Sequence, residues 1–350
     1  MDTTLNNTPI RTLVLGATGS IGYAVTANLL ARQLPVTILV RNRAKAGALF
    51  PNAPTLTIVE GDAQDAALLS RLVADGQNWP THIVHGINYP YNQWFGNMDT
   101  VTQKVIDAAG LRKATIVFPG NVYNFGNTKE PIREDSRPNQ PSARPITRKG
   151  QLRIELEAML EGATIAGKCR VLNVRLPDFW GPNVLNAGVQ PIFEGGLKGK
   201  AMPWLINADI PHQSVYTKDA AEIIVRLMLR PNSPGGYQVW NYGGTTLPSM
   251  RWFFEKISAL TGKPVQIKVH SRLAIRFLGL FVPVIREVQE MLYLYANTIL
   301  LDDTKVRSRF PDFRETPMEE ALTETLTWFA EHQLMQPFTP VTGPNSVVLA

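Results

Sequence analysis

The sequence is poor in cysteine, because Cys169 is the single thiol among 350 residues. One cysteine cannot form an intrachain disulfide, so the chain is compatible with a reducing compartment, and we expect it in the cytoplasm. The first seven residues are polar and lack the apolar core of a signal peptide, which favours the same compartment. We also predict no metal site.

Long apolar runs are absent as well. The longest, Leu273 to Ile285, is interrupted by Arg276 and Pro283 and is too short to span a bilayer. A surface or partner-facing helix fits this stretch better than a membrane span does, and a buried helix fits it better still. We therefore predict a protein with no membrane partner.

Charge of one sign is only mildly in excess. The 35 Lys and Arg residues exceed the 29 Asp and Glu residues by 6, and the sequence pI is about 9.4, but no long basic run accompanies the excess. We therefore expect no nucleic-acid partner, and a phosphate-bearing cofactor would account for part of the charge. With 44% apolar and 18% charged residues, the composition is that of a soluble globular protein with one large or two modest domains.

Strand and helix patterns alternate through the first half of the chain. Arg11–Leu15 predicts a buried strand, and apolar residues then recur at helical spacing from Ile21 to Leu30. Such repeated units predict an α/β fold with a doubly wound parallel sheet that binds ligands at the carboxyl ends of its strands. Further strands are predicted at Val36–Val40, Leu56–Val59, His82–His85, Thr115–Phe118 and Cys169–Val174.

The alternation loosens after about Pro177, where Gly, Pro, Trp and Arg become frequent. A helix at Val215–Met228 and a strand at Tyr237–Tyr242 are predicted to return to the main sheet. We therefore divide the chain into a Rossmann domain of residues 1–177 and 215–245, a smaller substrate domain of 178–214 and 246–335, and a tail of 336–350.

The most informative motif is the run Gly16-Ala17-Thr18-Gly19-Ser20-Ile21-Gly22, directly after the apolar Leu13–Leu15. Glycine permits positive φ and close approach of a ligand, and a tight turn from strand to helix needs both. The first amides of the helix then point at an anion, and the helix dipole favours negative charge there. A plain tight turn is the alternative, but the place of the motif in the first strand–helix unit predicts a dinucleotide site. The residues predicted to hold the pyrophosphate are Gly16, Thr18, Gly19, Ser20, Ile21 and Gly22.

Arg41 ends the second predicted strand, 19 residues after Gly22. An NAD-selective protein places a carboxylate here to bind the ribose 2′-hydroxyl, whereas an arginine pairs with a 2′-phosphate. Arg43 and Lys45 add positive charge nearby. The sequence thus favours NADP over NAD as cofactor, and the alternative is a solvated basic cluster at a strand end.

Two further residues follow strands on the same predicted edge of the sheet. Asp62 is predicted to accept a hydrogen bond from the adenine amino group, or else to act as a turn residue before a helix capped by Asp65. Gly86 would let the backbone approach the cofactor. His85, just before it, could titrate near neutrality, but a histidine at a strand end is more often structural.

The glycine motif and Asp62 are followed along the chain by three further segments, which are Asn121-Val122-Tyr123, Arg175–Pro182 and His212–Ala220. Together they resemble the extended short-chain dehydrogenase/reductases, the NAD-dependent epimerase/dehydratase family, over roughly residues 10–330. The resemblance implies a Rossmann sheet of about seven strands with a small C-terminal substrate domain, and it places Pro177 on the nicotinamide side. It also implies nucleotide-sugar epimerase or dehydratase activity, and homodimers are common in the family.

The sequence departs from the family at the catalytic positions. Family enzymes carry Tyr-x-x-x-Lys, in which the lysine lowers the pKa of a tyrosine that exchanges a proton as hydride moves. The lysine matches Lys149, but Pro145 stands where the tyrosine belongs. The serine or threonine expected near the end of the fifth strand is also missing, since that stretch reads Phe118-Pro119-Gly120. The chain thus resembles the atypical members of the family.

Three residues are left as catalytic candidates. Lys149 can hydrogen-bond the nicotinamide ribose, and the alternative is a surface lysine in the first turn of a helix, where the dipole disfavours it. Tyr123 is the nearest replacement acid, and Asn121 could orient a substrate carbonyl. Aromatic residues that could wall the pocket, most of them also compatible with a core or interface, are Tyr89, Tyr91, Trp94, Trp180, Trp204 and His212.

Three functions remain open at this point. The first is NADP-dependent reduction of a carbonyl or activated double bond of a small molecule, which needs mainly hydride positioning. The second is nucleotide-sugar epimerisation or dehydration, which is disfavoured because oxidising a hydroxyl needs a base where Pro145 stands. The third is a non-catalytic NADP-binding sensor or assembly partner, which would not consume the cofactor. The sequence favours an enzyme and leaves its substrate open.

Overall fold

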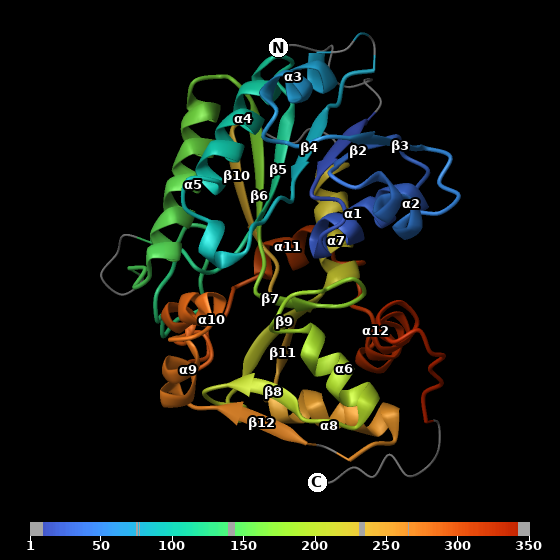
Figure 1. Cartoon of the computed structure of the whole chain (residues 1–350). Helices are drawn as coiled ribbons and strands as arrows, with labels where there is room; N and C mark the ends of the chain where they lie inside the picture. Colours follow the sequence, from blue (N-terminus) through green and yellow to red (C-terminus); the bar gives the residue numbers. More distant parts are fainter. Residues whose placement is uncertain are drawn as a thin grey trace.

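The computed structural model describes residues 10–341 except 75, 77, 139–143, 231–234 and 265. The main strands are β1 Thr12–Leu15, β2 Val36–Val40, β3 Leu56–Glu60, β4 His82–His85, β5 Thr115–Gly120, β6 Arg170–Arg175 and β10 Tyr237–Asn241. They form a seven-stranded sheet in the order β10-β6-β5-β4-β1-β2-β3, in which every neighbouring pair is parallel. The predicted Rossmann sheet is therefore confirmed (Figure 1).

The strand order defines the edge at which a ligand can bind. β1 pairs with β2 on one side and with β4 on the other, so the strand order reverses beside β1. In open parallel sheets, ligands bind outside the carboxyl ends of the strands at such a switch point. The glycine loop follows β1 and Gly86 follows β4, so both lie there. β10 returns to the edge of the sheet beside β6, as predicted.

Helices cover both faces of the sheet because its central strands are apolar on both. In β1, the side chain of Val14 joins one buried cluster, whereas Leu13 and Leu15 join another, as the alternation of a strand requires. A short helix, α2 Arg43–Leu49, lies between β2 and β3. The covering helices are α1 Ser20–Ala31 and α7 Thr217–Met228 on the Val14 face, and α3 Ala66–Ala74, α4 Met98–Gly110 and α5 Arg148–Ile165 on the other.

A second, smaller group of elements lies beyond the carboxyl ends of the strands (Figure 1). Its elements are β7 Asp178–Trp180, α6 Gln190–Lys198, β8 Met202–Leu205, β9 His212–Tyr216, β11 Thr245–Leu247, α8 Met250–Thr261, β12 Ile267–His270 and α12 Met318–Gln333. They include a three-stranded sheet in the order β11-β9-β7 and a two-stranded sheet of β12 and β8. The helices share an aromatic core, in which the rings of Phe193 and Phe329 stack with centroids 5.2 Å apart.

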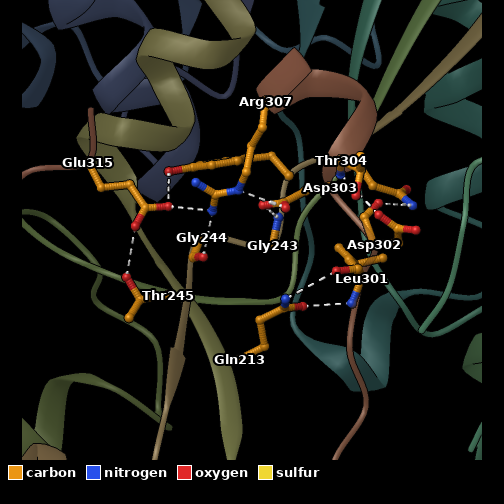
Figure 2. A network of polar contacts seen from close by, with 12 residues as sticks. Gln213, Gly243, Gly244, Thr245, Leu301, Asp302, Asp303, Thr304, Arg307 and Glu315 are labelled. Carbon is orange, nitrogen blue, oxygen red and sulfur yellow. Dashed lines mark hydrogen bonds and ion pairs between the residues drawn. The ribbon is translucent and has the colours of Figure 1, made fainter. Parts of the chain in front are cut away.

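The chain returns from this group to the main sheet through residues 301–315, which include α11 Thr304–Arg309. A polar network holds this stretch in place (Figure 2). The Arg307 guanidinium lies 2.8 Å from the Asp303 carboxylate and 2.8 Å from that of Glu315. The buried side chain of α11 belongs to the apolar cluster of the main sheet. Part of the range that we assigned to the substrate domain therefore packs against the Rossmann sheet.

Two short helices, α9 Arg272–Leu278 and α10 Pro283–Val288, lie at one side of the second group (Figure 1). The sequence favoured a buried helix across Leu273–Ile285, and this prediction is wrong. Most apolar side chains of the stretch are exposed, up to 76% at Leu280. Pro283 accounts for the break between the helices, because proline can begin a helix but cannot continue one.

No helix in the described part of the chain is long and apolar enough to cross a membrane. Of the predicted tail, residues 336–341 are described, and the N–H of Val341 donates to the Leu260 carbonyl at 2.9 Å. The polar N-terminal residues 1–9 and the rest of the predicted tail, 342–350, lie outside the described residues.

Candidate functional site

The loop between β1 and α1 is fixed by its glycines. Gly16 has φ +79°, and a Cβ on it would lie 2.5 Å from the Gly86 carbonyl oxygen. A Cβ on Gly22 would lie 2.2 Å from the Gly16 carbonyl oxygen. Gly86 in turn donates its N–H to the Leu15 carbonyl at 3.0 Å. Backbone therefore fills the space that side chains would need, and three of the predicted cofactor residues meet at one point.

The first turn of α1 is suited to an anion. Gly19 at its N-cap provides no side-chain hydrogen bond, and the first turn holds no acidic residue. Free N–H groups and the positive end of the dipole are what a phosphate binds. Ser20 begins this turn, whereas the side chain of Ile21 packs into the sheet core. Asn183, which follows β7, donates to the Thr18 carbonyl at 3.2 Å, so the second group of elements touches the loop directly.

The cations at the end of β2 differ in what they bind. Arg43 donates to the Ile58 carbonyl at 2.6 Å, so its guanidinium is partly committed to the protein. Arg41 and Lys45 have exposed side chains with no hydrogen bond or ion pair within the described ranges. The residue predicted to bind a 2′-phosphate is therefore available to a ligand.

Asp62 sits in a turn, as the alternative prediction stated. One of its carboxylate oxygens accepts the Gln64 N–H at 2.8 Å. Asp65 accepts the Leu68 N–H at 3.0 Å and so caps α3, as predicted. Because Asp62 is exposed, the turn is compatible with a contact to adenine, which stays a prediction.

His85, at the end of β4, belongs to the core. Its ring is 2% exposed and bonds the Thr102 hydroxyl at 3.0 Å. Burial, together with the charge of Arg153, lowers the pKa of His85 to about 3. The imidazole is therefore neutral at pH 7, which fits the structural role rather than proton transfer.

Lys149 is not on the surface, because its side chain is fully buried. Its Nζ donates to the Glu287 carboxylate at 2.5 Å and also to the Glu290 carboxylate, which lies on η3 Gln289–Met291. The same ammonium lies 5.3 Å from the centre of the Tyr91 ring. Sequence reasoning missed both carboxylates, because nothing in their spacing links them to a lysine 138 or 141 positions away.

Two phenols meet beside this lysine. The hydroxyls of Tyr91 and Tyr123 are 2.8 Å apart, and Tyr91 lies on η2 Tyr91–Gln93. Burial raises the pKa of Tyr91 to about 12, and burial raises that of Tyr123 well above its usual value, with the charge of Asp178 adding to both. Both phenols are therefore protonated at neutral pH. The Asn121 side chain accepts the Tyr123 N–H at 3.0 Å and so fixes the loop that carries this tyrosine.

Pro177 is buried between β6 and β7 and leads into Asp178. The Asp178 carboxylate lies 3.1 Å from His212 Nε2, and the rings of Trp204 and His212 pack nearly perpendicular to one another with centroids 5.3 Å apart. Sequence reasoning proposed His212 and Trp204 as pocket walls but did not pair His212 with Asp178. Trp180 lies instead in the core of the second group, against Phe193.

The remaining predicted walls gather around Tyr123. Trp94 stacks on the Tyr123 ring with centroids 6.1 Å apart, and its indole N–H donates to the Tyr89 carbonyl at 2.8 Å. Trp94 is 2% exposed, so it is a core residue that packs against the Tyr123 ring rather than a wall of an open pocket. The structure thus joins Lys149, Tyr91 and Tyr123 in one cluster, and places the glycine loop and Arg41 at the switch point of the sheet.

Comparison with known proteins agrees with this architecture. Residues 16–116 match the family model described as NAD(P)H-binding, and no curated protein matches the sequence. The enzyme WbmH of Bordetella bronchiseptica, solved with NAD+, is 19% identical with a TM-score of 0.70 over 92% of this chain and 99% of that one. The dTDP-glucose 4,6-dehydratase of Bacillus anthracis, solved with NAD, is 15% identical with a TM-score of 0.73 over 93% and 98%.

The UDP-glucose 4-epimerase of Thermotoga maritima, solved with UDP-glucose, is 17% identical with a TM-score of 0.70 over 92% of this chain and 99% of that one. The chain thus carries an NAD(P)H-binding domain. Its architecture is a Rossmann fold like that of the epimerase and the dehydratase named above.

Proposed function

We propose that this protein is an oxidoreductase that uses NADPH to reduce a carbonyl or an activated double bond of a small molecule. The observation that carries the proposal is the contact between the Tyr91 and Tyr123 hydroxyls, 2.8 Å apart, with the Lys149 ammonium 5.3 Å from the centre of the Tyr91 ring. A protonated phenol can give a proton to an oxygen that becomes negative, but it cannot take one from a hydroxyl. Because Pro145 offers no base either, the site favours reduction over the oxidation of a sugar.

The cofactor would lie across the switch point of the sheet. The glycine loop and the first turn of α1 would hold the pyrophosphate. Arg41 would pair with the 2′-phosphate, and Asp62 would accept the adenine amino group. Gly86 lies under the loop, and Pro177 would border the nicotinamide. NADPH, when bound, supplies the hydride.

Lys149 and the two phenols would act on the nicotinamide and substrate side. The Lys149 ammonium donates to the Glu287 and Glu290 carboxylates and, at 3.3 Å, to the Glu287 backbone carbonyl, so a ribose hydroxyl would replace this longest contact. Tyr123 Oη would donate a proton to the substrate oxygen, Tyr91 Oη, 2.8 Å away, would pass its own proton to Tyr123, and water would return a proton to Tyr91 as the product leaves. Asn121 would act by holding the Tyr123 loop.

We also propose the arrangement of the chain around this chemistry. Residues 178–214 and 246–335 would enclose the substrate, apart from the stretch 301–315 that packs on the main sheet. A homodimer in the cytoplasm is the assembly and location that we propose.

Two other functions have support of their own. The similar structures include nucleotide-sugar epimerases and dehydratases, which supports that activity although the base is missing. A non-catalytic NADP sensor is supported by the two carboxylates that already occupy Lys149. Consumption of the cofactor separates an enzyme from a sensor.

The first test is calorimetric titration of the purified chain with NADPH and with NADH. Arg41→Ala should weaken NADPH binding by about 10-fold to 100-fold, as the loss of an arginine–phosphate pair does, and leave NADH binding nearly unchanged. Arg71→Ala, an exposed arginine on α3, is the matched control and should change neither. Equal losses for both cofactors would refute the NADP assignment.

A second measurement tests turnover. NADPH absorbance is followed with a panel of carbonyl and activated-alkene compounds, and with nucleotide sugars in parallel. Oxidation of NADPH by a carbonyl supports the proposal. Tight binding without consumption by any compound favours the sensor, and conversion of a nucleotide sugar without net cofactor use favours the epimerase.

A further inference from the structure

The segment of α9 and α10 exposes a group of apolar side chains, which are Leu273, Phe277, Leu278, Leu280, Phe281 and Val282. Their exposure ranges from 39% at Leu278 to 76% at Leu280. The rings of Phe277 and Phe281 pack on one another, with centroids 5.4 Å apart. Apolar groups gathered in this way mark a surface that another body covers, whereas scattered ones do not.

The charges around these side chains have one sign. Between Gly262 and Glu287 the sequence has five basic residues and no carboxylate. Arg272, Arg276 and Arg286 are exposed, and none of them has an ion pair in the part of the chain that the structure describes. The segment that carries the apolar group thus also carries three exposed guanidinium groups without an ion pair in the described part of the chain.

The nearest carboxylates along the chain do not cancel this charge. Glu287 lies on α10 and Glu290 on η3, but both carboxylates bind the buried Lys149 ammonium. They hold the end of the segment to the start of α5, and they form no ion pair with the exposed Arg272, Arg276 and Arg286 in the described part of the chain. Figure 1 shows α9 at the margin of the molecule, away from the seven-stranded sheet.

We propose that residues 272–286 dock onto an anionic lipid surface. Phe277, Leu280 and Phe281 would enter the boundary between headgroups and acyl chains, and the arginines would bind lipid phosphates. Exposed apolar side chains combined with basic ones are the combination that binds at a membrane interface without crossing it. This proposal departs from the expectation of no membrane partner, which was based on spanning segments alone.

The charge pattern also argues against a second copy of this chain on the same face. A two-fold interface brings the same patch of both subunits together. The arginines of the two copies would then face one another, which opposes association. An anionic surface instead gains from each cation that it neutralises.

Co-sedimentation of the purified full chain with lipid vesicles tests the proposal. Vesicles of phosphatidylcholine alone are compared with vesicles that also contain phosphatidylglycerol. We expect sedimentation with the anionic vesicles that weakens as salt is raised. Leu280→Asp with Phe281→Asp should reduce binding more than 10-fold. Arg272→Glu with Arg276→Glu should reduce it by about fivefold or more for each cation replaced.

Matched controls separate the segment from general effects. Leu111→Asp changes a leucine that is 52% exposed at the end of α4, and Arg71→Glu changes an exposed arginine on α3. Both should bind vesicles as the wild type does, and circular dichroism verifies the fold of every variant.

Several outcomes would overturn the proposal. These are absence of sedimentation, equal binding to neutral and anionic vesicles, and wild-type binding by the Leu280→Asp, Phe281→Asp variant. A dimer in sedimentation velocity that this variant dissociates, without vesicle binding, would assign the face to a second copy. Neither NADPH titration nor turnover enters the readout, so this test is independent of the proposed enzymatic function.

Discussion

The glycine loop, Gly16–Gly22, and the segment of α9 and α10 are opposite extremes of packing in one chain. In the loop, a single added methyl group would collide with backbone atoms at two positions. In the segment, whole phenyl and isobutyl groups contact water. The first region therefore has its shape fixed by its own fold, whereas the second has apolar surface that its own fold does not use.

The two regions also differ in the state that each needs before it binds its partner. A phosphate is bound by backbone N–H groups held in one arrangement, so the loop must be rigid and closely packed before the ligand arrives. A surface that docks onto another body must stay exposed until it does so. The Lys149 ammonium ties the second region to the main domain, because it lies at the start of α5 and binds the carboxylates of Glu287, on α10, and Glu290, on η3.

Of the substitutions within these two regions, the one with the largest expected effect breaks the packing of the loop. Gly22→Ala puts a Cβ 2.2 Å from the Gly16 carbonyl oxygen, and backbone cannot move aside cheaply. We expect a loss of about 3 kcal/mol in the free energy of unfolding, measured by urea denaturation. Gly47→Ala on α2 is the control, because a Cβ there meets nothing within 4 Å. It should be neutral or stabilising by up to about 1 kcal/mol. Equal effects for both variants would show that the loop tolerates substitution.

A smaller effect is expected where the segment of α9 and α10 is joined to α5. Glu287→Ala with Glu290→Ala leaves the fully buried Lys149 ammonium without its carboxylate partners. Loss of a partner in a fully buried ion pair costs about 3 to 5 kcal/mol, but these carboxylates are about one quarter exposed, so we expect about 2 kcal/mol in the same denaturation.

A third substitution separates the contribution of the ion pairs to stability from that of side-chain packing. Adding Lys149→Met to the double variant removes the unpaired charge, so the triple variant should regain most of the lost stability. No recovery would mean that the two glutamates stabilise the segment by packing rather than by charge.

The same contrast explains which parts of the molecule could be predicted from the sequence. The positions of the strands along the chain and the glycine turn follow from apolar runs and from backbone geometry, which neighbouring residues determine. Contacts across the chain leave no such pattern. Lys149 binds a carboxylate 138 positions away, and Tyr91 meets a phenol 32 positions away. An apolar run such as Leu273–Ile285 is visible in the sequence, but the sequence does not show whether other parts of the fold bury its side chains.

The smallest expected change in the free energy of unfolding comes from substitutions in the exposed segment. Leu280→Ser with Phe281→Ser removes apolar groups that already contact water, so little transfer free energy is lost on folding. We expect the free energy of unfolding to change by less than about 0.5 kcal/mol. The matched pair is Leu326→Ser with Phe329→Ser on α12, where both side chains are 0% exposed and each substitution should cost at least about 3 kcal/mol. A large loss in the first pair would mean that the folded chain buries these side chains, and the docking surface would then be part of its core.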